Sequence, residues 1–148
     1  MDNITIGIEN NFELKDQTAW TVWLARCIQR LDKQIGAVHI ALMSDESLRE
    51  LNQKHLNHND YTDVITFDHS VGNTLHCDIA ISTDRVLDNA DNEGVSFTNE
   101  LGRVMIHGIL HCVGFQDKTA HERAIMRQKE NAFLQLFHVE PKSNTQNV

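Results

Sequence analysis

The segment 107–117, HGILHCVGFQD, restricts the fold of this chain more than any other part of the sequence. Residues four apart on a helix project from the same face, so His107 and His111 can bring both imidazoles to one cation. Gly114 can take a left-handed conformation and reverse the chain, and Asp117 can then return as a third ligand. The segment therefore predicts a helix with two metal ligands, followed by a turn and a loop that supplies the third.

The complete pattern, rather than the histidine pair, makes this prediction specific. With nine histidines in 148 residues, a pair four apart arises easily by chance. His121, fourteen positions after His107, is an alternative third ligand, and a histidine pair that binds no metal is a further alternative. We predict one Zn²⁺ held by His107, His111 and Asp117. Three protein ligands leave a fourth position open for water, as in catalytic zinc sites.

The segment has the frame of the metzincin motif H-E-x-x-H-x-x-G-x-x-H, with two departures. Gly108 replaces the Glu that metalloproteases use as general base, which disfavours peptide hydrolysis by that mechanism. Asp117 replaces the third His, and a carboxylate is also a suitable zinc ligand. The sequence therefore predicts a metal-dependent hydrolase without an identifiable general base. A hydrolase of peptides or small molecules is an alternative.

The composition is that of an ordinary globular protein. The chain is 41% hydrophobic and 23% charged, which favours neither disorder nor a membrane protein. We expect one domain over residues 1–138, followed by a polar tail over residues 139–148. Neither a spanning apolar run nor a signal peptide is recognisable, so we expect a cytoplasmic protein without membrane association.

The charge and the cysteines limit the partners and the redox chemistry. A net charge of −8 argues against binding nucleic acid over the whole surface, so RNA, if it binds, would bind locally. We expect no DNA partner. Five of the thirteen Lys and Arg residues lie within 103–129, either as a solvated helix surface or as an RNA-facing patch. Cys27, Cys77 and Cys112 lack C-x-x-C spacing and are predicted to be buried thiols.

Hydrophobic periodicity predicts an α+β fold, with one mixed sheet of about four strands flanked by helices and a metal-binding helix near the C-terminus. The predicted strands are 4–8, 38–42, 62–67 and 78–82, of which the last two are expected to pair. The predicted helices are 14–31, a short helix after Ser44, a helix capped by Thr83 and closed by Gly94, a helix from Ser96 or Thr98 to Cys112, and 120–137.

Several segments together resemble the bacterial YbeY family. The segment 107–117 resembles the signature H-G-x-L-H-x-x-G-[YF]-x-[HD], in which Gly follows the first His. Leu51-Asn52, then TDVITF at 62–67, then DIAIS at 78–82 follow the order of that family's L-N, T-D-V-x-S-F and G-D-I-x-I-S segments. The resemblance covers residues 38–135. It implies a zinc-dependent, single-strand-specific endoribonuclease that acts on the ribosomal subunit, in 16S rRNA 3′-end maturation and ribosome quality control.

Two positions depart from that family's pattern. Leu56 stands where the family usually carries an Arg that is suspected of handling RNA phosphate, so we assign no RNA contact to it. His58 is a conjectural substitute, with an ordinary surface histidine as the alternative. Cys77 stands where the family has Gly before the Asp.

Polar residues near the motif have both functional and structural interpretations. Arg103 lies one helical turn before His107 and is a candidate phosphate contact, with Glu100 as a possible support for Arg103 or for a ligand imidazole. Salt bridging is the structural alternative for both. Thr62, Asp63 and Asp78 begin predicted strands, where they either line a cleft or cap turns. A non-catalytic, ribosome-associated module with structural zinc is the alternative from another functional class.

Overall fold

A four-stranded sheet and five helices form the part of the chain that the computed structural model describes, residues 3–57 and 61–137. In chain order the elements are β1 Ile4–Ile8, α1 Gln17–Arg30, β2 Gln34–Met43, α2 Asp45–Leu56, β3 Val64–Asp68, β4 Thr74–Ser82, α3 Thr83–Glu93, α4 Phe97–Cys112 and α5 Ala120–Leu134. The predicted α+β class is confirmed. The predicted tail, 139–148, and His58 lie outside the described residues.

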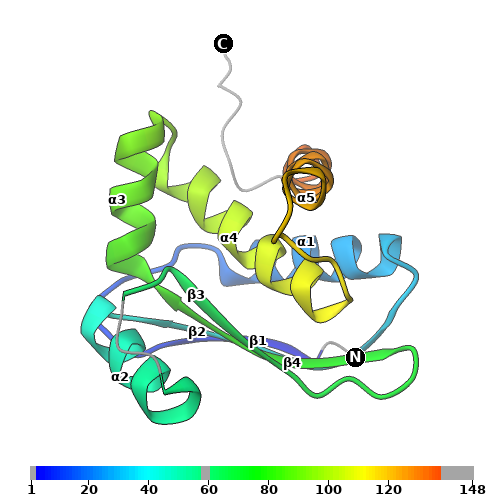
Figure 1. Cartoon of the computed structure of the whole chain (residues 1–148), viewed down its shortest axis with the longest axis horizontal. Helices are drawn as coiled ribbons and strands as arrows, with labels where there is room; N and C mark the ends of the chain where they lie inside the picture. The colour runs from blue at the N-terminus through cyan, green and yellow to red at the C-terminus, as the bar shows by residue number, and fades with distance from the viewer. Residues whose placement is uncertain (1–2, 58–60, 138–148) are drawn as a thin grey trace.

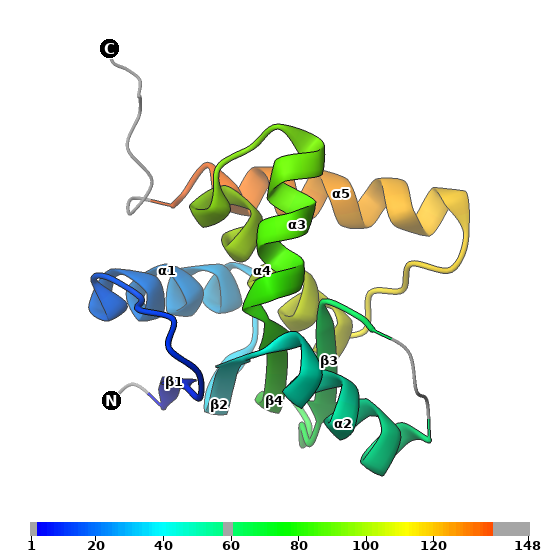
Figure 2. The ribbon, with the colours of Figure 1, turned by 90° about the vertical axis from the view of Figure 1, so that its left-hand side faces the viewer.

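The sheet has the strand order β1-β2-β4-β3 and is mixed. β1, β2 and β4 run parallel, and α1 provides the crossover from β1 to β2. β3 is antiparallel to β4, with Val64 opposite Ile81 and Asp68 opposite Cys77, so the predicted pairing of these two segments is confirmed. This places the start of β3 at one edge of the sheet, where it faces α4 (Figure 2).

Helices cover the two faces of the sheet unequally. α1 and α4 pack on one face, α5 covers the outer side of α4, and α2 lies on the opposite face (Figure 1). α4 is consequently buried on most sides, and its apolar residues include Leu101, Met105, Ile106 and Leu110, each fully buried. A helix that is apolar nearly all round is expected in such a middle layer. α4 is therefore the most firmly held element that carries predicted site residues.

The helix termini show how local sequence sets these boundaries. Ser44 and Ser96 cap α2 and α4 as predicted, each accepting a hydrogen bond from a backbone N–H three residues later. The predicted Thr83 cap is wrong, because Ser82 caps α3 instead. The Thr83 hydroxyl is occupied elsewhere: it donates to the Met43 carbonyl at 3.3 Å and accepts from Asn10 at 2.9 Å.

The chain reverses direction at the end of α4, as the glycine in the motif predicts. Gly114 has a φ of 111°, its N–H donates to the His111 carbonyl at 3.0 Å, and the Phe115 N–H donates to the Leu110 carbonyl at 3.0 Å. The three cysteines are free and buried, as predicted. Within the described residues, none of the helices is long and apolar enough to cross a membrane.

Candidate metal centre

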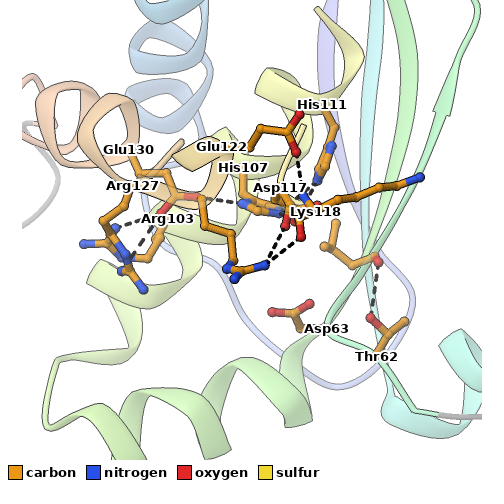
Figure 3. A network of polar contacts seen from close by, with 12 residues as sticks. Thr62, Asp63, Arg103, His107, His111, Asp117, Lys118, Glu122, Arg127 and Glu130 are labelled. Atoms are coloured by element: carbon orange, nitrogen blue, oxygen red, sulfur yellow. Dashed lines mark hydrogen bonds and ion pairs between the residues drawn. The ribbon is translucent and has the colours of Figure 1, made fainter. Parts of the chain in front are cut away.

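His107, His111 and Asp117 converge at the C-terminal end of α4 (Figure 3). The two Nε2 atoms are 3.1 Å apart, and Asp117 Oδ2 lies 3.3 Å from His107 Nε2 and 3.2 Å from His111 Nε2. Within residues 3–57 and 61–137, this is the group of metal-ligating side chains whose donor atoms all lie within 4.8 Å of one another. All three residues are partly exposed, so solvent reaches the cluster.

The spacing of the donor atoms suits a tetrahedral ion. Ligand bonds of about 2.0–2.1 Å around a tetrahedral Zn²⁺ place neighbouring ligand atoms roughly 3.3 Å apart. The three observed separations match this, and two imidazole nitrogens with one carboxylate form a donor set of the catalytic type. The group could therefore hold a metal ion and leave a fourth position open.

Glu130 of α5 supports His107 and was missed in the sequence. Its Oε2 lies 2.6 Å from His107 Nδ1, its Oε1 accepts from Arg103 at 2.9 Å, and its side chain is only 5% exposed. A carboxylate at Nδ1 keeps the proton there and leaves the Nε2 lone pair for a metal. The available signal was helical spacing: Glu130 shares the buried face of α5 with Met126 and Phe133.

The hydrogen bond between His107 and Glu130 shifts the pKa values of both groups in favour of their charged forms. Burial works against ionisation of His107, but the hydrogen bond to Glu130 and the nearby carboxylates outweigh it and raise the imidazole pKa. Burial likewise opposes the Glu130 carboxylate, but the hydrogen bonds from His107 and Arg103 outweigh it and lower the Glu130 pKa. The network therefore holds a buried negative charge at Nδ1 of His107, on the opposite side of the ring from the Nε2 that belongs to the candidate metal group.

Arg103 is part of this network rather than free in the cleft. Besides Glu130, it donates to the side chain of Asn131 at 2.9 Å, which fits the salt-bridging alternative. Glu100, the predicted support, is buried, and its Oε1 has no hydrogen-bond partner. Glu130 thus occupies the supporting position that the sequence suggested for Glu100.

Asp117 is held by the loop between α4 and α5. Arg123 Nη1 donates to the carbonyls of Asp117 at 3.4 Å and Lys118 at 3.0 Å. Thr119 and Glu122 form a capping box that begins α5, and Glu122 also accepts from the Lys118 N–H at 3.0 Å. His121, the alternative third ligand, is exposed in the first turn of α5 and does not belong to the cluster.

Two cavities meet at His107 and Asp117. The α5 cavity, of about 270 Å³, has polar walls formed mainly by Asn89, Glu93, Glu100, Arg103, Arg123 and Arg127. The α2 cavity, of about 450 Å³, is lined by Asn52, Leu56, Thr62, Thr66 and His111, among others. Asp63 and Val64 line both cavities. The cluster therefore sits in the middle of a cleft that continues on both sides.

The three strand-end residues lie at different places relative to the cleft. Thr62 and Asp63 line it, whereas the exposed Asp78 lies at the other end of the β3–β4 pair and contacts His69 Nε2 at 3.2 Å. Burial raises the pKa of Asp63, although the nearby His107 works against that shift. Leu56 is 45% exposed in the α2 cavity, so an apolar side chain occupies part of its wall.

Gly108 allows α4 to approach the sheet closely. A Cβ at this position would lie 3.0 Å from Ile79 Cγ2 and 3.2 Å from Thr66 Cγ2. The position next to the first ligand therefore faces β3 and β4 rather than the cleft.

Comparisons with known proteins identify the family of this chain. Residues 5–138 match the family model described as Endoribonuclease YbeY. A protein of Christiangramia forsetii named Endoribonuclease YbeY is 46% identical over 132 residues, covering 89% of this chain and 92% of that protein. One of the same name from Flavobacterium psychrophilum is 43% identical, covering 92% of this chain and 97% of that protein.

A solved structure shares the fold. The solution structure of TM1509 from Thermotoga maritima has a TM-score of 0.65 and 28% sequence identity, and the match covers 96% of this chain and 93% of that one. With the family match over residues 5–138, these likenesses show that the chain belongs to the endoribonuclease YbeY family.

Proposed function

We propose that this protein is a zinc-dependent, single-strand-specific endoribonuclease. We propose further that it acts on ribosomal RNA in the cytoplasm, at the 3′ end of 16S rRNA on the ribosomal subunit, and serves ribosome quality control. The observation that carries the proposal is the cluster of His107, His111 and Asp117, with donor atoms 3.1–3.3 Å apart at the centre of a cleft. Membership of a family of endoribonucleases supports the reaction type.

The residues of the chain have separable roles in this reaction. A bound Zn²⁺ would supply Lewis acidity at the scissile phosphate and a fourth position for water. His107 and His111 fix two of its ligand directions from a buried helix, and Asp117 provides the third from the loop. Glu130 holds the His107 imidazole in orientation through the 2.6 Å contact at Nδ1. The attacking group is either water or the 2′-hydroxyl of the RNA, and the chemistry of the product ends distinguishes these routes.

The dimensions of the cleft support single-stranded RNA as substrate. The cavities on either side of the cluster, of about 270 and 450 Å³, are of the size of small-ligand sites. Unstacked nucleotides can enter such spaces, whereas base-paired nucleotides stay stacked inside their helix. We therefore expect cleavage in loops, ends and unpaired segments of RNA.

Cleavage of a labelled ribosomal RNA fragment tests the proposal. Wild-type protein, chelator-stripped protein and zinc-restored protein are compared with His111→Ala purified in the same way. Activity that disappears on stripping, returns with zinc and is absent from His111→Ala supports the proposal, and the identical purification controls for contaminating nucleases. Equal cleavage by mutant and wild type, or none by folded, zinc-loaded protein, would overturn it.

A further inference from the structure

The α5 cavity has an acidic wall that the metal centre does not use. Asp63 at the start of β3, Glu93 at the end of α3 and Glu100 in the first turn of α4 supply carboxylates, with the amide of Asn89 beside them. Asn89 Nδ2 lies 3.4 Å from Asp63 Oδ2, which links the two at the edge of this wall. Arginines of α5 stand at the same cavity, so it is strongly polar and contains groups of both signs.

Among these acidic residues, Glu100 is buried and has an oxygen without a hydrogen-bond partner. Its residue is only 3% exposed, and its Oε1 is buried without a hydrogen-bond partner. A buried carboxyl oxygen without a donor costs free energy, and such groups in folded proteins normally find a partner in protein, water or ligand. Glu100 also lines the cavity, but its Oε1 is closed to solvent, so a donor from a molecule bound there reaches this oxygen only when the carboxyl group turns toward the cavity.

The acidic residues of the α5 cavity do not form a second group of three ligands for a metal ion. The only group of three metal-ligating side chains within 4.8 Å, among the described residues, is the His107, His111 and Asp117 cluster. The carboxylates of the α5 cavity are therefore too spread to converge on one ion together. Acceptors distributed along a wall instead suit a ring system that presents several N–H groups along one edge.

We propose that the α5 cavity binds a single guanine base of the RNA, next to the phosphate at the metal centre, with Glu100 as the residue that reads its Watson–Crick edge. This rests on the proposed function. Guanine presents a ring N–H and an exocyclic amine side by side, and one carboxylate can accept from both. Adenine and cytosine place a ring acceptor beside the amine, and uracil flanks its N–H with carbonyls, so a carboxylate repels part of each edge.

The position of the cavity agrees with a nucleotide bound across it. A volume of about 270 Å³ lies near the lower end for small-ligand pockets and suits one base rather than several. His107 and Asp117 border the same cavity, so a base bound against Glu100 would leave its phosphate near the cluster. Arg123 also lines this space and is exposed. Its Nη1 donates to loop carbonyls, and a phosphate would be bound by its other N–H groups.

Binding of short 2′-O-methylated RNAs tests the base preference. Methylation blocks attack by the 2′-hydroxyl, and gel analysis of the RNAs after the titration checks that water has not cleaved them. Because burial raises the pKa of Glu100 to about 7, the titration is done above that pH, where the carboxyl group is ionised. Zinc-loaded wild-type protein is titrated with fluorescent oligouridines that carry one guanosine, inosine, adenosine or cytidine at the centre. Inosine lacks only the exocyclic amine, so replacing guanosine by inosine should weaken binding roughly tenfold. Equal binding of guanosine and inosine by the wild type would overturn the proposal, even if the protein cleaves RNA.

Glu100→Gln identifies the residue that reads the base. The amide keeps the shape of the carboxyl but offers one acceptor, so the variant should bind the guanosine and inosine RNAs with nearly equal affinity. Glu13→Gln, an exposed position elsewhere, is the matched control and should keep the wild-type preference. A preference retained in folded Glu100→Gln would overturn the assignment to Glu100. If the variant does not fold, the wild-type comparison of guanosine with inosine still decides.

Two further outcomes separate this proposal from the nuclease itself. A guanosine preference in a protein that cuts no RNA would support the base subsite and overturn the proposed function. Magnesium that, without RNA, raises the melting temperature of the wild type but not of Glu100→Gln would assign the cavity to an ion and overturn the base subsite.

Discussion

His107 and Asp117 face the same point from supports of very different kinds. His107 lies on α4, which packs between the sheet and α5, and its imidazole is backed by the buried Glu130. Asp117 lies on the loop after α4, its side chain is 38% exposed, and Arg123 holds the loop through backbone carbonyls. The helix side of the centre is thus fixed by core packing, and the loop side by polar contacts close to solvent. A metal ion should therefore meet a preformed histidine pair and draw in a more adaptable carboxylate.

The largest expected effect comes from removing a ligand on the helix side. His111→Ala should weaken zinc binding by more than the roughly 10–100-fold typical of supporting residues, because no nearby group can replace the imidazole. Asp117→Asn should cost less, since the amide oxygen can still approach from an adjustable loop. Zinc affinity measured by competition with a chromophoric chelator checks both. Equal losses in the two variants would contradict the difference between helix and loop.

Glu130→Gln tests whether the helix side depends on its buried support. The amide no longer holds the Nδ1 proton of His107 as a carboxylate does, so zinc affinity should fall by about 10–100-fold. Chelator competition gives this value, and thermal unfolding of the metal-free protein separates it from a loss of stability caused by the lost ion pair between Arg103 and residue 130. An unchanged zinc affinity in a folded variant would show that packing alone orients His107.

The pH dependence of folding stability measures how strongly burial affects Glu100 on the helix side of the site. Burial, and secondarily the nearby Glu93, raises the pKa of Glu100 to about 7 from the 4.5 of an exposed glutamate. Between these values the folded chain holds the proton that the unfolded chain releases, so this residue makes stability fall as pH rises from about 4.5 to 7. Glu100→Gln should remove that decline and gain about 2–3 kcal/mol relative to the wild type above pH 7.

Urea denaturation of metal-free protein at several pH values measures this difference. Glu13→Gln provides the matched control at an exposed glutamate. A difference between Glu100→Gln and the wild type that stays constant from pH 5 to 8 would show that Glu100 titrates normally.

The smallest effect is expected on the loop side. Arg123→Ala removes the donor to the carbonyls of Asp117 and Lys118, an exposed contact worth about 1 kcal/mol. Zinc affinity should therefore fall only about threefold to tenfold, with little change in the melting temperature of the metal-free protein. A loss as large as that of Glu130→Gln would mean that the loop is as tightly organised as the helix.

The predictable part of the site is the part with local geometry. His107 and His111 follow from helical spacing, and the reversal at Gly114 follows from one residue, so the three-ligand group can be predicted within eleven consecutive residues. Glu130 lies 23 residues after His107 and reaches it only because α5 packs on α4. Asp63 reaches the cleft because β3 forms the sheet edge that faces α4. Such partners depend on tertiary packing, to which a single sequence gives only indirect access.

In the fold, too, features set by local sequence were predicted and features set by tertiary pairing were not. The periodic segments placed all nine elements correctly, because apolar spacing reports directly on which face of a helix or strand is buried. The ends were less accurate: β2 begins at Gln34 and β4 at Thr74, each four residues earlier than predicted. These extensions carry fewer buried side chains and are held by strand pairing, including Gln34 with Thr74, which the alternation of either segment alone does not reveal.

The close packing of Gly108 against the sheet also restricts which residues can follow the first histidine of the motif. A Cβ at this position would lie 3.0–3.2 Å from methyl groups of Ile79 and Thr66, so any larger residue requires these side chains to shift. Replacing Gly108 with the glutamate of a metalloprotease would require the side chains of Ile79 and Thr66 to shift before a general base could stand beside the first histidine. Close packing on the sheet therefore opposes the substitution that would bring this motif to the metalloprotease pattern.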